Sequence, residues 1–290
     1  MTSNFILATQ AATGFSEAEK YDKHRPSYPV EAVEKLLSHL NVSGVQNAKI
    51  VDLACGTGKF TEALAMRPEE YEVIGVEPHE SMRETLIKKN LGNRLNVLDG
   101  EAGNIPVGEG WADALVAAQA FHWFANEESL RDIHRVLTPG GTFGMIWNAE
   151  DYNGMKDWEP TTKWEEKLKV IVNGLDDGLS RFRDGDWKKV FEDQQKTSPL
   201  QALKDTFMHQ LPQFSLPLGE ESVGWTVWLS EQAIWDRYST LSHIANTRGS
   251  QREQIHRDVF DAFKGDDVER NEKGEIAVHG VTYLAWTSRV

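Results

Sequence analysis

Residues 50–66 read IVDLACGTGKFTEALAM, and this stretch decides the fold. The apolar run over residues 50–54 predicts a short buried strand, and the periodicity of residues 59–66 predicts a helix. Gly56 and Gly58 lie between the two, where glycine lets the backbone turn sharply and lets a ligand approach it closely. A strand that leads through such a turn into a helix is typical of nucleotide-binding α/β folds, although a Gly-x-Gly pair alone is weak evidence.

The same alternation of strand and helix continues on both sides of this stretch. Helices are expected over residues 30–40, 80–90 and 127–137, and strands over residues 72–77, 95–98, 114–118 and 142–147. Strands separated by helices form a parallel sheet that is covered on both faces. We therefore predict an α/β fold with a Rossmann-like, mostly parallel sheet.

The alternation ends after Asn148. Residues 150–197 and 215–264 are expected to form helical insertions that cap the sheet, and residues 276–288 a last, antiparallel strand. Residues 203–216 alternate like a further strand, which Pro212 limits to an edge or a terminus. Residues 1–290 are interpreted as one domain with a cofactor-binding core at residues 15–148.

The composition argues against several partners. The chain has 45 acidic and 31 basic residues, a net charge of −14, and no basic cluster stands out. Because Lys and Arg contacts to phosphate supply most nucleic-acid affinity, we expect neither a nucleic acid nor a membrane as partner. No apolar run approaches the roughly 20 residues that span a bilayer. The single cysteine, Cys55, rules out an internal disulfide and suits a reducing, cytoplasmic setting.

Two ligands compete for the glycine turn. Glu77 ends the next strand, 19 residues after Gly58, where nucleotide-binding folds place a carboxylate that accepts both ribose hydroxyls. A dinucleotide also requires a third glycine, so that its pyrophosphate can sit on the helix N-terminus, and Thr61 occupies that position. Asp52 would repel a pyrophosphate, but it suits the ammonium and sulfonium groups of S-adenosylmethionine. The sequence favours S-adenosylmethionine over NAD.

Five segments in the same order resemble the motifs of class I S-adenosylmethionine-dependent methyltransferases. They are IVDLACGTGKFTEAL (50–64), EVIGVEPHESM (72–82), LDGEAGNIPV (98–107), DALVAAQAFHWF (113–124) and IHRVLTPGGTFGMIW (133–147). The variant resembles the ubiquinone C-methyltransferase-like group. AQAFHWF, with the upstream YDKHRPSYP (21–29), is similar to a subgroup that includes trans-aconitate methyltransferase and fungal small-molecule methyltransferases. Many relatives carry glycine at the position of Ala54, and alanine fits there if its φ is negative.

The resemblance implies a cofactor-binding role for each matching residue. These residues are Tyr21, Arg25, Asp52, Ala54, Gly56, Thr57, Gly58, Glu77, Pro78, Met82, Glu101, Ala102 and Gln119. Glu77 is expected to hold the ribose, Glu101 the adenine amino group, and Arg25 the carboxylate of the cofactor. Ordinary helix packing for Met82 and a surface ion pair for Arg25 remain the alternatives.

Methyl transfer is an in-line displacement at a carbon already activated by the sulfonium, so positioning supplies much of the rate. A base is needed only if the nucleophile arrives protonated. His122, just past the fourth strand, is the candidate catalytic base, with a structural role in its loop as the alternative. No His/Cys/Asp constellation has the spacing of metal ligands, so we expect no metal.

Aromatic residues are expected to line the acceptor pocket. Nine of the ten tryptophans lie at or beyond residue 123. Trp225, Trp228 and Trp235 share one face if their segment is helical, and such a stripe serves either as core or as pocket. Trp123, Phe124 and Trp147 are predicted to line the same apolar pocket as these three tryptophans.

This predicted pocket fits a hydrophobic small-molecule metabolite better than a tricarboxylate. We expect a thiol acceptor, such as a dithiol secondary metabolite, because no clear base is present and a thiol needs little help to ionise. The oxygen of a carboxylate or hydroxyl is the second interpretation and nitrogen the third. A cofactor-binding protein without methyl transfer also fits the sequence.

Overall fold

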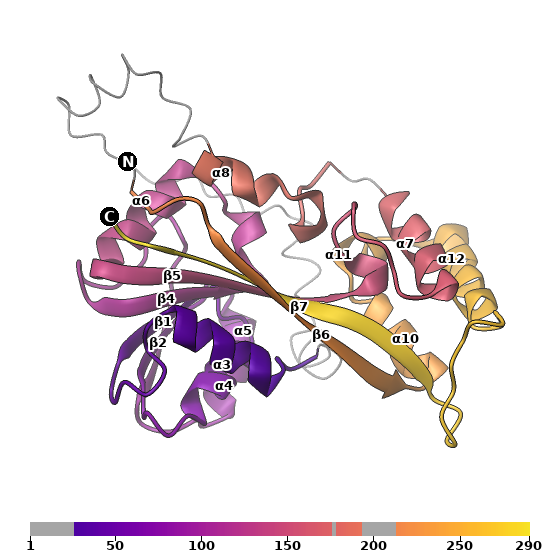
Figure 1. Ribbon diagram of the computed structural model, residues 1–290, viewed down its shortest axis with the longest axis horizontal. Helices are drawn as coiled ribbons and strands as arrows, with labels where there is room; N and C mark the ends of the chain where they lie inside the picture. The colour runs from indigo at the N-terminus through magenta and orange to yellow at the C-terminus, as the bar shows by residue number, and fades with distance from the viewer. Residues whose placement is uncertain (1–25, 176–177, 193–212) are drawn as a thin grey trace, which may run out of the picture.

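A seven-stranded sheet forms the centre of the computed structural model, which describes residues 26–175, 178–192 and 213–290 (Figure 1). The strand order is β3-β2-β1-β4-β5-β7-β6. The strands are β1 (Lys49–Leu53), β2 (Glu72–Val76), β3 (Leu95–Leu98), β4 (Ala112–Ala118), β5 (Leu137–Glu150), β6 (Gly219–Leu229) and β7 (Ile276–Ser288).

Strands β1 to β5 run parallel, and β7 is antiparallel to both of its neighbours, β5 and β6. Four of the five residues of β1 are buried, as expected for a parallel strand with helices over both faces. The predicted Rossmann-like, mostly parallel sheet with a C-terminal antiparallel strand is confirmed.

One face of the sheet is covered by α3 (Val30–His39), α4 (Lys59–Ala65) and α5 (Glu80–Lys88). Leu36 and Leu37 of α3 and Leu64 of α4 belong to a buried cluster that includes Ile50 of β1 and Ile146 of β5. These contacts anchor α4 directly behind the glycine turn, which fixes where its N-terminus lies.

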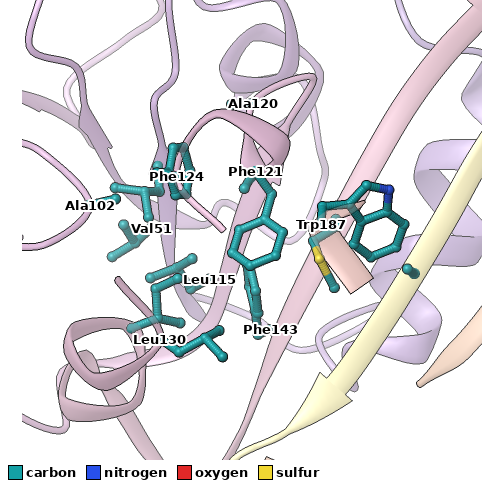
Figure 2. Packing of buried hydrophobic residues seen from close by; sticks show 14 of the residues in the cluster. Val51, Ala102, Leu115, Ala120, Phe121, Phe124, Leu130, Phe143 and Trp187 are labelled. Carbon is teal, nitrogen blue, oxygen red and sulfur yellow. The ribbon is translucent and has the colours of Figure 1, made fainter. Parts of the chain in front are cut away.

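The other face is covered by α6 (Glu127–Val136), by α8 (Lys189–Glu192) and by the short helices η1 (Phe121–Trp123) and η4 (Asp186–Lys188). Phe121 is central to their packing, between Phe143 and Trp187 (Figure 2). The centroid of its ring lies 5.2 Å from that of Phe143 and 6.4 Å from that of Trp187. This aromatic core ties η1, which follows β4, firmly to the sheet.

A separate cluster of helices packs where β5, β6 and β7 extend beyond the shorter strands (Figure 1). It contains α7 (Lys163–Asn173), α10 (Glu231–Tyr238), α11 (Ser242–Ala245) and α12 (Gly249–Ala262), with η2 (Asp151–Asn153) beside it and η3 (Phe182–Asp184) leading back to the sheet. Its core joins Trp164 and Tyr238 to Ile276 and Val278 of β7. None of the helices in the described ranges is long and apolar enough to cross a membrane.

The prediction that all of residues 215–264 are helical is wrong in its first part. Gly219–Leu229 forms β6, which pairs with β7 from Gly219 opposite Trp286 to Leu229 opposite Ile276. Val223, Trp225 and Val227 alternate with exposed residues, which is the period of a strand. Most of the segment predicted as a strand over residues 203–216 lies outside the described residues.

Candidate functional site

A cavity opens at the carboxyl ends of β1, β2 and β4, the edge at which open α/β sheets bind ligands. Eleven residues predicted for the cofactor or the acceptor line this cavity: Ala54, Gly56, Thr57, Glu77, Pro78, Met82, Glu101, Ala102, Gln119, Trp123 and Phe124. Tyr21 and Arg25 lie outside the described residues. The other predicted residues do not line the cavity: Asp52, Gly58, His122, Trp147, Trp225, Trp228 and Trp235.

The glycine turn has a left-handed backbone at three positions. The φ angles of Ala54, Gly56 and Gly58 are +56°, +57° and +86°. A β-carbon on Gly58 would lie 2.2 Å from Cδ1 of Leu86, so both the backbone angle and the space require glycine there. The expectation of a negative φ at Ala54 is wrong, since the turn out of β1 holds this alanine in the left-handed region.

Glu77 faces the glycine turn from the end of β2. Its Oε2 accepts a hydrogen bond from the backbone N–H of Gly56 at 2.9 Å, and its Oε1 accepts one from the N–H of His79, also at 2.9 Å. Burial raises the pKa of Glu77, and these two donors act in the opposite direction. The carboxylate is thus held in one orientation at the cavity wall, with remaining lone pairs that can accept the hydroxyls of a diol.

Asp52 is fully buried and does not reach the cavity. Its Oδ2 accepts a hydrogen bond of 2.6 Å from Oγ1 of Thr61, on the first turn of α4. Burial raises the pKa of Asp52 from its ordinary value of 3.8 to about 7. Thr61, which replaces the third glycine of a dinucleotide site, therefore serves as the hydrogen-bond partner of this carboxyl group.

Several cavity residues were not predicted. Pro26 and Tyr28 come from the segment that leads into α3, Lys59 and Phe60 from α4, and His79 from the N-terminus of α5. The ring of Tyr28 packs edge-on against Phe60, with 5.4 Å between the centroids. Pro26 and Tyr28 belong to the motif YDKHRPSYP, in which Tyr21 and Arg25 were predicted instead.

Trp147 and His122 form a pair beside the cavity. The prediction that Trp147 lines the acceptor pocket is wrong: its side chain is fully buried, and its ring lies 4.8 Å from Phe182 and 4.7 Å from Trp187. Its indole Nε1 donates a hydrogen bond of 3.2 Å to Nδ1 of His122. Since an indole can only donate, the neutral His122 ring carries its proton on Nε2. In this arrangement neither ring nitrogen of His122 is available to take a proton from an acceptor.

The three C-terminal tryptophans do not form one face. Trp225 and Trp228 lie on opposite sides of β6, and Trp228 is 39% exposed. Trp235 belongs to the core of the helical cluster, where its ring centroid lies 4.7 Å from that of His256. The three tryptophans were predicted to share a helical face, but Trp225 and Trp228 lie on a strand, so that spacing does not place them together. They are not brought together at the cavity.

No group of three or more His, Cys, Asp or Glu side chains among the described residues is arranged to hold a metal ion. The chemistry that the cavity offers is instead recognition of a polar ligand with apolar parts. Glu77 and Glu101 supply carboxylates, Met82 and Phe124 supply apolar surface, and Gln119 supplies an amide.

Residues 51–145 match the family model described as a methyltransferase domain. A methyltransferase-like protein of Schizosaccharomyces pombe, itself uncharacterised, is 32% identical over 61% of this chain and 64% of its own length. The match therefore spans less than two thirds of that relative. An uncharacterised methyltransferase of Mycobacterium bovis is 29% identical over 80% of this chain and 77% of its own length. The YcgJ protein of Bacillus subtilis has a similar fold, with a TM-score of 0.54 at 16% identity over 89% of this chain and 98% of that one.

Proposed function

We propose that this chain, whose residues 51–145 match a methyltransferase domain, is a class I methyltransferase that transfers the methyl group of S-adenosylmethionine to a small-molecule acceptor. The observation that carries the proposal is the orientation of Glu77. Its two oxygens accept N–H groups from the glycine turn and from the start of α5, so the carboxylate stands at the cavity wall ready to accept ribose hydroxyls.

The cavity fits this cofactor. Glu77 would hold the ribose, and Glu101 would accept a hydrogen bond from the adenine amino group. The backbone N–H of Ala102 would donate to the adenine ring beside it, and Met82 would pack on the ring; all four residues line the cavity. Gly56 has a left-handed backbone and no side chain, so its backbone atoms are exposed to the cavity. The amino-acid part of the cofactor would lie against them. When bound, S-adenosylmethionine supplies a methyl group on a positively charged sulfur, ready for in-line displacement.

The chain's own residues position the acceptor and exclude water. Trp123 and Phe124 supply an apolar wall beside Gln119, and the aromatic core behind η1 keeps this wall rigid. We favour a thiol acceptor, because His122 is not arranged as a base and a thiol ionises near pH 8.5 without one. Carboxylate or hydroxyl oxygen is the second choice and nitrogen the third. We place the reaction in cytoplasmic small-molecule metabolism, in the subgroup similar to trans-aconitate methyltransferase.

Cofactor binding is tested by titration calorimetry with S-adenosylhomocysteine, the demethylated product. Glu77→Gln should weaken binding about 10- to 100-fold, since hydrogen bonds to a charged group are worth roughly 1.5–3 kcal/mol. Glu72→Gln, at the exposed start of the same strand, is the matched control and should bind like the wild type. Binding of NADH in place of S-adenosylhomocysteine would contradict the proposal.

Methyl transfer is tested by turnover with labelled S-adenosylmethionine and a panel of hydrophobic thiols, carboxylic acids, alcohols and amines. A higher rate of methyl transfer to thiols than to the other classes would support a thiol acceptor. Transfer to carboxylates alone would replace it with the second choice. Cofactor binding without transfer to any class would favour a binding protein.

A further inference from the structure

Asn148, near the end of β5, makes three hydrogen bonds with parts of the chain that are far apart in sequence. Its side chain is 5% exposed. Its Nδ2 donates to the backbone oxygen of Ser27 at 3.2 Å, and its Oδ1 accepts from Oγ1 of Thr282 at 2.6 Å. Its backbone oxygen accepts from Nε2 of Gln119 at 2.7 Å.

The direction of each hydrogen bond is fixed by chemistry. The indole Nε1 of Trp225, which can only donate, gives a hydrogen bond of 3.2 Å to Oγ1 of Thr282. The hydroxyl proton of Thr282 is then directed to Oδ1 of Asn148, and the amide nitrogen of Asn148 must face the carbonyl of Ser27, which can only accept. The result is a polar relay that runs from Trp225 through Thr282 and Asn148 to Ser27.

The outer end of this relay is held rigidly. The ring of Trp225 packs closely against Gly280, where a β-carbon would be 2.5 Å from two ring atoms. Trp225 lies directly opposite Gly280 across the β6–β7 ladder, and Val223 lies opposite Thr282. The relay is therefore anchored on two paired strands, although none of its anchoring residues touches the cavity.

The inner end of the relay borders the cavity at two places. Ser27 lies between Pro26 and Tyr28, which both line the cavity, in a segment without regular structure. Gln119 also lines the cavity, and it holds a left-handed φ of +59°. A carbonyl in an irregular segment has no helix or strand to orient it, so the amide of Asn148 sets its direction.

We infer that Asn148 is a positioning residue: it holds the wall formed by residues 26–28 and the side chain of Gln119 in the geometry that the cofactor needs. This inference rests on the proposed function, because it assumes that the cavity binds S-adenosylmethionine. Trp225 then acts through the relay, as the outer support of the cofactor wall.

Three variants of the full chain separate positioning from general stability, with S-adenosylhomocysteine calorimetry and melting temperature as readouts. Asn148→Asp keeps the size and the acceptor for Thr282 but turns a second acceptor toward the oxygen of Ser27, and should weaken binding about tenfold. Thr282→Val removes the donor to Asn148 and should weaken binding about three- to tenfold. Thr282→Ser restores the hydroxyl and should restore affinity to within about twofold of the wild type.

Thr287→Val is the matched control on the same strand. Oγ1 of Thr287 donates a hydrogen bond of 2.6 Å to the oxygen of Ser215, far from the relay. This control should lower the melting temperature and leave cofactor affinity unchanged. If Asn148→Asp does not fold, Thr282→Val and Thr282→Ser carry the test.

If the wild type binds S-adenosylhomocysteine and both Thr282→Val and Asn148→Asp bind it with the same affinity, the inference is overturned and the proposed function stands. Equal losses of affinity in Thr282→Val and Thr287→Val would also overturn it, since the effect would then be general destabilisation. A wild-type protein that binds no S-adenosylhomocysteine would overturn the proposed function, and the inference with it.

Discussion

Asp52→Asn tests the electrostatics beneath the glycine turn. In the wild type, Asp52 is fully buried with one hydrogen-bond donor, Thr61, and its Oδ1 has no hydrogen-bond partner in the described part of the chain. Burial raises its pKa from 3.8 to about 7, so the fold favours the protonated carboxyl group. Asparagine keeps the shape and the acceptor for Thr61, but it cannot ionise.

The sign follows from proton linkage. A carboxyl whose pKa is raised in the fold contributes stability that is fully present below its unfolded pKa and is lost as the pH rises through about 7. Because each pKa unit is worth about 1.4 kcal/mol, the wild type should lose about 3 kcal/mol relative to Asp52→Asn between pH 5 and pH 9. The buried amide of the variant lacks an acceptor, which costs about 1–3 kcal/mol at every pH. Relative to the wild type, Asp52→Asn should therefore gain about 3 kcal/mol in stability from pH 5 to pH 9 and be the more stable protein at pH 9.

Urea unfolding of both proteins at several pH values between 5 and 9 measures this difference, because other titrating groups cancel in the comparison. Asp113→Asn changes an exposed carboxylate of β4 and is the control; its stability should follow that of the wild type at every pH. Parallel curves for Asp52→Asn and the wild type would show that Asp52 is ionised in the fold, and the argument from burial would fail.

Four further substitutions test the backbone and the packing. Ala54→Gly should leave the free energy of unfolding unchanged or raise it by up to about 1 kcal/mol, as measured by chemical denaturation. The reason is that removing the strain of a left-handed alanine outweighs the entropy that glycine adds to the unfolded chain. Gly58→Ala should cost about 1–3 kcal/mol and weaken S-adenosylhomocysteine binding, because the new methyl group collides with Leu86; unchanged stability would contradict the geometry. Trp235→Ala should cost about 3–5 kcal/mol, whereas Trp228→Ala on the exposed side of β6 should cost under about 1 kcal/mol; equal losses in thermal unfolding would contradict the assignment.

The sheet and much of the cavity wall were predictable because their signals are local. A buried parallel strand is a continuous apolar run, and the glycine turn and Glu77 follow such runs directly along the chain. All but four of the predicted cofactor residues line the cavity: Gly58 supports the turn from behind, Asp52 is buried under it, and Tyr21 and Arg25 lie outside the described residues.

The C-terminal half was less predictable because its signals depend on tertiary partners. The sequence of β6 places Trp225 and Trp228 three residues apart, which fits a helix face as well as it fits two sides of a strand. Only pairing with β7 decides between them. Trp147 was misassigned for a similar reason: its strand ends near the cavity, but its side chain points to the face that α8 and η4 cover.

Two residues on the rim of the cavity hold a strained backbone conformation. Ala54 and Gln119 both line the cavity and both hold left-handed backbone, with φ of +56° and +59°. For residues other than glycine this conformation costs roughly 1–2 kcal/mol each, so the surrounding structure must enforce it. At Gln119 the enforcement is visible: its N–H donates to the oxygen of Ile146 and its side chain to the oxygen of Asn148, both on β5. The strand that carries Asn148, β5, thus also holds the strained Gln119 through two backbone oxygens, so β5 restrains the shape of a cavity built from β1, β2 and β4.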